Sequence, residues 1–114
     1  MENEKRVVAR ANLDKELRYF RMAGRKMPYC PKWLRRVRQA LGIKATEMAR
    51  QLEVNPSVIF RLEKSEDRKT ISLKALDKMA RAMDCKLVFA VVPQRDETIA
   101  ELAERQRWVR RLGK

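Results

Sequence analysis

The sequence contains no histidine and has only three glycines among its 114 residues. Without histidine there is no Ser-His or Cys-His pair that could activate a nucleophile. Gly24, Gly42 and Gly113 are too far apart in the chain to build a glycine-rich phosphate-binding loop. A lysine or carboxylate site stays open as the remaining catalytic alternative, but the many charges are better explained as solvated helix faces. The sequence therefore predicts a protein that is not an enzyme.

Cysteines and long apolar runs are also scarce. Cys30 and Cys85 lie far apart and match no metal-ligand spacing, so we expect reduced thiols, no metal site and no cofactor. No apolar run approaches the ~20 residues that span a membrane, and no apolar signal-peptide segment follows the acidic start MENEK. These absences predict a cytoplasmic protein with no membrane partner.

Positive charge is abundant. The chain has 28 Lys and Arg residues against 15 Asp and Glu, which gives a formal net charge of +13. This charge favours polyanions as partners, namely DNA, RNA or an anionic membrane surface, and the absences above make the membrane the weaker alternative. Charge alone would also explain non-specific binding, in which all nucleic-acid sequences bind equally and affinity falls steeply with salt.

Residues 42–63, GIKATEMARQLEVNPSVIFRLE, have the pattern of two short amphipathic helices joined by one tight turn. Apolar residues recur at helical spacing up to Leu52, and the turn falls at Glu53 and the residue after it. Asn55 is a natural N-cap, and Pro56 suits the first position of a second helix. This pattern predicts a helix-turn-helix, a motif that binds DNA.

The second of these helices, at residues 55–64, has an outward stripe opposite the apolar Ile59 and Leu62. We expect base contacts from this stripe, at Ser57, Phe60 and Arg61. Arg61 lies at its centre and is expected to bind guanine O6 and N7, against the alternative of a solvated arginine. For Phe60, packing on a thymine methyl group and burial inside the protein both stay open.

Four cations near the motif are expected to bind DNA phosphates. They are Lys44, Lys64, Arg68 and Lys69. The alternative for the last three is an ordinary charged helix end and loop. Lys44 stands where a capping Ser, Thr or Asn is common in such motifs, so a phosphate contact is its expected role.

Amphipathic patterns elsewhere predict further helices. Gly24 and a proline-containing linker are expected to end the first, Gly42 to end the second as a C-cap, and Ser72 to begin the third as an N-cap. The last is acidic at its start and basic at its end, as suits the helix dipole. The expected ranges are 3–22, 33–41, 72–84 and 96–112.

Residues 85–93, CKLVFAVVP, are β-branched or apolar and end at a proline, which predicts a strand. One strand cannot satisfy its own backbone groups, and the chain offers no second one. A second copy of the chain, pairing antiparallel across a two-fold axis, would supply the partner. A homodimer is therefore expected, and the dimerisation residues are Leu87, Val88, Phe89, Ala90 and Val91.

Residues 33–63 resemble the Cro/CI, or Xre, type of helix-turn-helix, and nearly the whole chain resembles the mobile mystery protein A family. The segments that carry the second resemblance are WLRRVRQALG at 33–42 and LEKSEDRKTISLKALDKMARAMDCKLVFAVVP at 62–93. The terminal strand is similar to that of Hip-type antitoxins. The resemblance implies an all-α, lambda-repressor-like bundle with one C-terminal strand shared by two subunits. It also implies a structural ion pair between Arg38 and Glu63.

Two departures from the motif are visible. Glu53 stands where the turn usually has glycine, and a left-handed residue of another type costs about 1 kcal/mol. Ala45 replaces a glutamine that often contacts DNA, so no base contact is expected from that position.

These observations divide the chain into four expected parts: an N-terminal helix and linker (1–31), a DNA-binding domain (32–84), a dimerisation strand (85–93) and a basic C-terminal helix (94–114). The expected function is that of a dimeric transcriptional repressor or autorepressor, which binds a palindromic operator on double-stranded DNA with recognition helices about 34 Å apart. The alternative is an antitoxin from mobile DNA that neutralises a Fic/Doc-type or other toxin partner encoded nearby, with DNA binding secondary.

Overall fold

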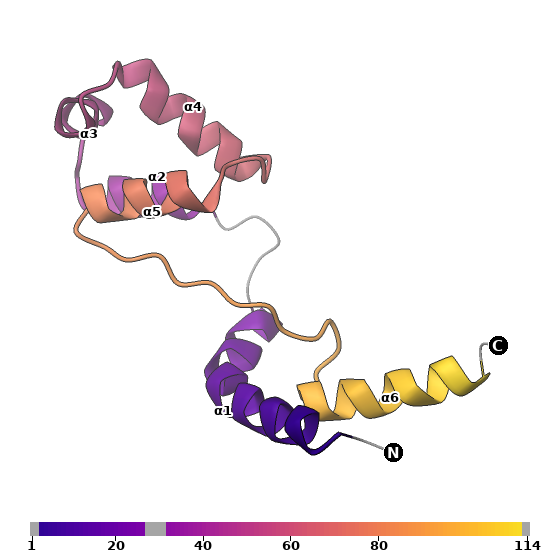
Figure 1. Cartoon of the computed structure of the whole chain (residues 1–114). Coiled ribbons are helices and arrows are strands. Elements are labelled where there is room, and N and C mark those ends of the chain that lie inside the picture. The colour runs from indigo at the N-terminus through magenta and orange to yellow at the C-terminus, as the bar shows by residue number, and fades with distance from the viewer. Residues whose placement is uncertain (1–2, 27–31, 113–114) are drawn as a thin grey trace. The chain divides into compact units, whose positions relative to one another are not determined.

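The computed structural model describes residues 3–26 and 32–112. The described residues form six helices, so the fold is all-α (Figure 1). This agrees with the predicted fold class, apart from the predicted strand. They form two compact units, one containing α1 and α6 and the other containing α2 to α5. The linker predicted at 27–31, with Cys30, lies outside the described residues. The helices are α1 (Glu4–Lys26), α2 (Trp33–Ala40), α3 (Ala45–Leu52), α4 (Pro56–Asp67), α5 (Leu73–Ala82) and α6 (Ile99–Leu112).

Several helix boundaries differ from the predictions. α4 continues to Asp67 rather than ending at Lys64, and α5 ends at Ala82 rather than at Asp84. The first helix does not end at Gly24 but continues to Lys26, because one glycine inside a helix costs only about 1 kcal/mol. The last helix begins at Ile99 rather than near residue 96. Thr98 caps it: its hydroxyl accepts a hydrogen bond from the Glu101 N–H (3.0 Å), and its own N–H donates to the Glu101 carboxylate (2.9 Å). This capping box lowers the pKa of Glu101, chiefly through the Thr98 N–H.

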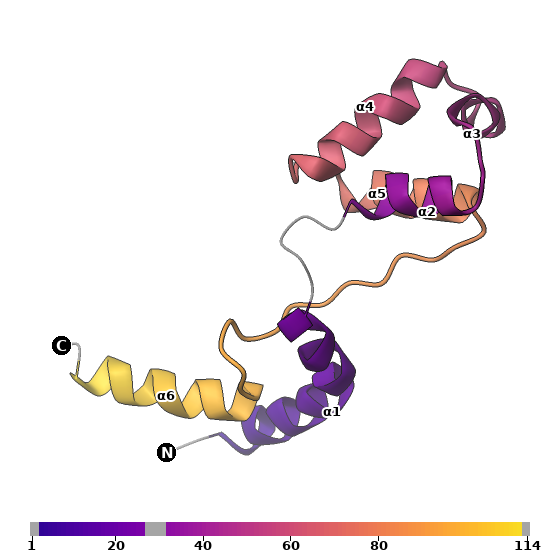
Figure 2. The same cartoon turned by 180° about the vertical axis from the view of Figure 1, so that it is seen from behind.

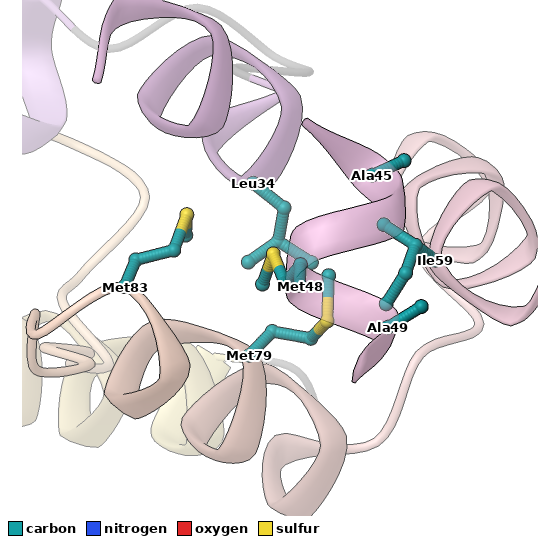
Figure 3. Close-up of a cluster of buried hydrophobic side chains, with 7 residues drawn as sticks. All are labelled: Leu34, Ala45, Met48, Ala49, Ile59, Met79 and Met83. Carbon is teal, nitrogen blue, oxygen red and sulfur yellow. The ribbon is translucent and has the colours of Figure 1, made fainter. Parts of the chain in front are cut away.

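The core of the α2–α5 unit is a small cluster of apolar side chains (Figure 3). Ile59 of α4 is completely buried and Ala49 of α3 is 1% exposed, so the two helices cross closely. Met48 and Met79 meet from α3 and α5. Leu34, rather than Trp33, is the buried residue at the start of α2. The buried cluster consists of Leu34, Ala45, Met48, Ala49, Ile59, Met79 and Met83.

The turn between α3 and α4 lies where the sequence predicted it. Glu53 is left-handed, with φ 57° and ψ 45°. The Glu53 N–H donates to the Arg50 carbonyl (3.2 Å) and the Val54 N–H to the Ala49 carbonyl (2.9 Å), which satisfies the end of α3. The Asn55 side chain then accepts the Ser57 N–H at 3.0 Å and caps α4. The backbone conformation that usually requires glycine is therefore adopted here by glutamate.

The strand predicted at residues 85–93 does not form within one chain. These residues are an irregular, extended segment, and no strand is present in the described ranges (Figure 1). The reason is the one that suggested a dimer: no second extended segment is hydrogen-bonded to this one, so no ladder can form. Pairing with a second copy stays a prediction.

The α1–α6 unit has a sparse core. Leu17 is the buried residue of α1, whereas several large apolar side chains of this helix are exposed. The start of α6 is held by Asp14 of α1, whose carboxylate accepts the N–H groups of Ile99 (2.7 Å) and Ala100 (3.2 Å). The exposed apolar residues of α1 are Val7, Val8, Leu13, Tyr19 and Met22.

Candidate nucleic-acid interface

The outward face of α4 consists of four exposed residues, Ser57, Phe60, Arg61 and Lys64, which we call the recognition stripe. On the opposite face Ile59 is buried in the core and Glu63 is 1% exposed. α4 packs against α3 and α2, and α5 packs against α2 and α3 (Figure 2). The residues predicted to contact bases therefore share one solvent-facing side of a helix whose other side is fixed.

A buried ion pair fixes α4 to α2. Arg38 donates from Nε to Glu63 Oε2 at 2.6 Å and from a terminal nitrogen to Oε1 at 3.1 Å. Its other terminal nitrogen donates to the Ile43 carbonyl at 3.1 Å. The hydrogen bond to Glu63 raises the pKa of Arg38 further above its ordinary value. The two residues that the resemblance paired are thus in direct, two-pronged contact, with 8% and 1% of their surfaces exposed.

A second carboxylate joins the same two helices. Glu66 accepts the backbone N–H groups of Trp33 (3.0 Å) and Leu34 (2.9 Å), which would otherwise be unpaired at the start of α2. Lys32, the residue before α2, provides no side-chain cap. The sequence did not point to Glu66 as a site residue. The available signal was its position three residues after Glu63, which places both carboxylates on one side of α4.

A third contact extends this connection to the next residue of α4. Arg35 donates to Asp67 at 3.2 Å and lies 3.7 Å from Glu63. Three carboxylates of α4, those of Glu63, Glu66 and Asp67, therefore contact α2, which contributes two arginines and two backbone N–H groups. This pairing orients α4 with respect to the core.

Phe60 is exposed, which answers the question that the sequence left open about its burial. It is 54% exposed, and its ring lies under the Arg38 guanidinium, with 5.8 Å between the guanidinium carbon and the ring centroid. Arg38 therefore contacts both the buried Glu63 and one member of the recognition stripe.

The residues predicted to bind phosphates are all exposed. Lys44 directly precedes α3, and Lys64 lies on the stripe. Arg68 ends α4, where its N–H donates to the Lys64 carbonyl at 3.0 Å, and Lys69 follows with a left-handed φ of 59°. Their contacts with DNA stay predictions.

The predicted dimerisation residues are mostly exposed as well. Val88, Phe89 and Val91 are 57%, 64% and 84% exposed, and Leu87 is half-buried. Residues 85–88 also border a largely apolar groove of about 420 Å³ between α2 and α5. Cys85 at this edge is a free thiol.

Comparison with known proteins supports the helix-turn-helix. A family model described as Helix-turn-helix matches residues 34–89. The chain therefore contains a helix-turn-helix domain of the Cro/CI (Xre) type, which is a DNA-binding domain typical of transcriptional regulators and typically not found in enzymes. The searches of curated proteins and of solved structures gave no match.

The described part of the chain contains neither a membrane-spanning helix nor a metal site. Within residues 3–26 and 32–112, no helix is long and apolar enough to cross a membrane. The same part of the chain contains no group of three or more His, Cys, Asp or Glu residues arranged to hold a metal ion.

The Arg38–Glu63 pair yields a stability prediction. Glu63→Ala should lower the free energy of unfolding by about 3–5 kcal/mol, because it leaves the Arg38 charge buried without its partner. Urea denaturation followed by circular dichroism measures this. The control is Asp77→Ala, which removes an exposed ion pair with Arg81 and should cost at most about 1 kcal/mol. Equal losses in the two variants would contradict the prediction.

Proposed function

We propose that the protein is a dimeric, sequence-specific transcriptional regulator that binds a palindromic operator through α4 and acts as a repressor or autorepressor. The observation that carries this proposal is the recognition stripe on a helix anchored by buried charges. Its cytoplasmic location and its kinship with the mobile mystery protein A family are parts of the same proposal.

The chemistry of the stripe supports specific rather than purely electrostatic binding. Arg61 offers a planar set of donors that matches guanine O6 and N7, and Ser57 offers a hydroxyl near the start of the helix. The exposed cations Lys44, Lys64, Arg68 and Lys69 supply charge for phosphates, which position a protein on DNA without distinguishing its sequence. The alternative is non-specific binding driven by the net charge of +13, and a comparison of specific with random DNA distinguishes the two.

Two arginines, Arg61 of α4 and Arg68 directly after this helix, give a matched test of specificity. In a gel shift at two salt concentrations, the protein should prefer DNA from upstream of its own gene over random duplex. Arg61→Ala should reduce this preference by roughly 5- to 150-fold, since a bidentate contact with guanine is worth about 1–3 kcal/mol. Arg68→Ala should weaken binding to both duplexes alike and lower the salt slope by about one. The proposal would be lost if wild-type protein showed no preference at either salt concentration.

The extended segment at 85–93 supports the dimer. Its apolar side chains are exposed in the single chain, and its backbone has no ladder partner within the described residues. Antiparallel pairing with a second copy would bury these side chains and supply hydrogen-bond partners for the backbone. It would also relate two copies of α4 by a two-fold axis. The adjoining groove between α2 and α5 provides further apolar surface at the same place.

Disrupting this segment should produce monomers. Phe89→Asp introduces a charge that would be buried in the paired strands, so the variant should have the mass of one chain in analytical ultracentrifugation and should bind a palindromic duplex weakly. Tyr19→Asp is the control, because Tyr19 is similarly exposed (69% against 64%) but lies in α1. Phe89→Asp protein that retained the dimer mass would exclude the strand as the dimer interface.

A second candidate function is that of an antitoxin that covers a toxin of the Fic/Doc or another type. The observation that favours it is the α1–α6 unit, which exposes Val7, Val8, Tyr19 and Met22 and buries only Leu17 of α1. Exposed apolar surface of this kind is typical of protein-protein contact sites.

Co-expression with the product of the adjacent gene separates the two functions. An antitoxin should co-purify with this product and suppress its toxicity, and Val8→Asp should abolish both effects while leaving operator binding intact. Arg61→Ala should do the reverse. If neither the wild-type protein nor the Arg61→Ala variant suppressed the toxicity, the antitoxin role would be excluded.

A further inference from the structure

Phe60 lies at the surface beside a residue of the buried ion pair. The Arg38 guanidinium carbon is 5.8 Å from the centre of its ring, and 54% of the residue is exposed. Arg38 is itself fixed by two hydrogen bonds to Glu63 and one to the Ile43 carbonyl. The ring therefore lies beside a side chain that is itself held by three hydrogen bonds, while more than half of the residue stays exposed.

Exposure of an apolar side chain is common and by itself indicates nothing. Phe60 differs in its place on the recognition stripe, one residue before Arg61 and one helical turn after Ser57. A phenyl ring has no hydrogen-bond donor or acceptor. Among the groups that base pairs present in the major groove, the C5-methyl group of thymine is the apolar one, and a phenylalanine can pack against it.

We propose that Phe60 is a specificity-determining residue, which selects thymine by packing on its C5-methyl group in the half-site where Arg61 contacts guanine. This inference rests on the proposed function.

The same contact disfavours cytosine. Cytosine presents an amino donor in the major groove and has no methyl group. The phenyl ring would cover that donor without accepting its hydrogen bond, which carries a desolvation cost. Uracil removes the methyl group alone and keeps the remaining hydrogen-bonding pattern of thymine. Exchange of thymine for uracil therefore isolates the proposed interaction.

The experiment uses the full chain and duplexes enriched by selection from random DNA. Each thymine of a half-site is replaced in turn by deoxyuridine, and affinity is measured for both forms. One position should show about four-fold weaker binding, the effect expected for burial of one methyl group. Phe60→Ala should reduce this ratio to about one and keep the Arg61-dependent preference for guanine, whereas Phe60→Leu should retain a preference for thymine. Because each ratio compares two duplexes on one protein sample, partial loss of folded protein cancels.

Tyr19→Ala is the matched control. Tyr19 is an exposed aromatic residue that also stacks with an arginine, Arg18, at 5.2 Å, but it lies in α1. This variant should keep the four-fold ratio. The methyl contact would be overturned if no thymine of the enriched sequence gave weaker binding when replaced by deoxyuridine. It would also be overturned if Phe60→Ala left the ratio of the two affinities unchanged. Either result would leave the regulator function standing. Failure to enrich any sequence would overturn both.

Discussion

The orientation of the candidate DNA-binding helix depends on one buried ion pair, Arg38 with Glu63. Burying two charges is expensive unless the geometry is good and the remaining donors are satisfied. Here the carboxylate receives two hydrogen bonds, and a third donor of the guanidinium reaches the Ile43 carbonyl. Such a pair tolerates little rotation of one helix against the other. It therefore contributes more to the orientation of α4 than to the net free energy of folding. A well-packed apolar pair of similar volume would stabilise the fold equally well.

In each unit, a carboxylate on one helix caps the start of another helix. This helix either lacks a side-chain cap of its own or receives the carboxylate in addition to one. Glu66 of α4 accepts the first N–H groups of α2, and Asp14 of α1 accepts those of α6. In each case a carboxylate from one helix satisfies orphan donors of another and lies at the positive end of its dipole. A cap of this kind also fixes the angle between the two helices, so secondary structure and packing are specified by the same contact.

Local signals in the sequence predicted most of the α2–α5 unit. Asn55 and Ser72 cap the helices that they were expected to cap. The C-cap of α2 is Leu41 rather than Gly42, which follows it with a left-handed φ of 70°. These features depend on neighbours within a few residues. Glu66 and Asp14 were missed because their partners lie 32 to 86 residues away in the chain. The Arg38–Glu63 pair was expected only through the family resemblance, since periodicity alone does not identify which charged residues are buried.

The exposed side of α4 was predictable for a related reason. Once the buried side of a helix is known, its periodicity determines the opposite face, so the recognition stripe follows from Ile59 and the residues around it. What periodicity does not reveal is which member of the stripe contacts the buried ion pair. Phe60 does, because the Arg38 guanidinium that is hydrogen-bonded to Glu63 lies 5.8 Å from the centre of its ring. One arginine therefore contacts both the buried carboxylate that orients α4 and an outward side chain of the same helix.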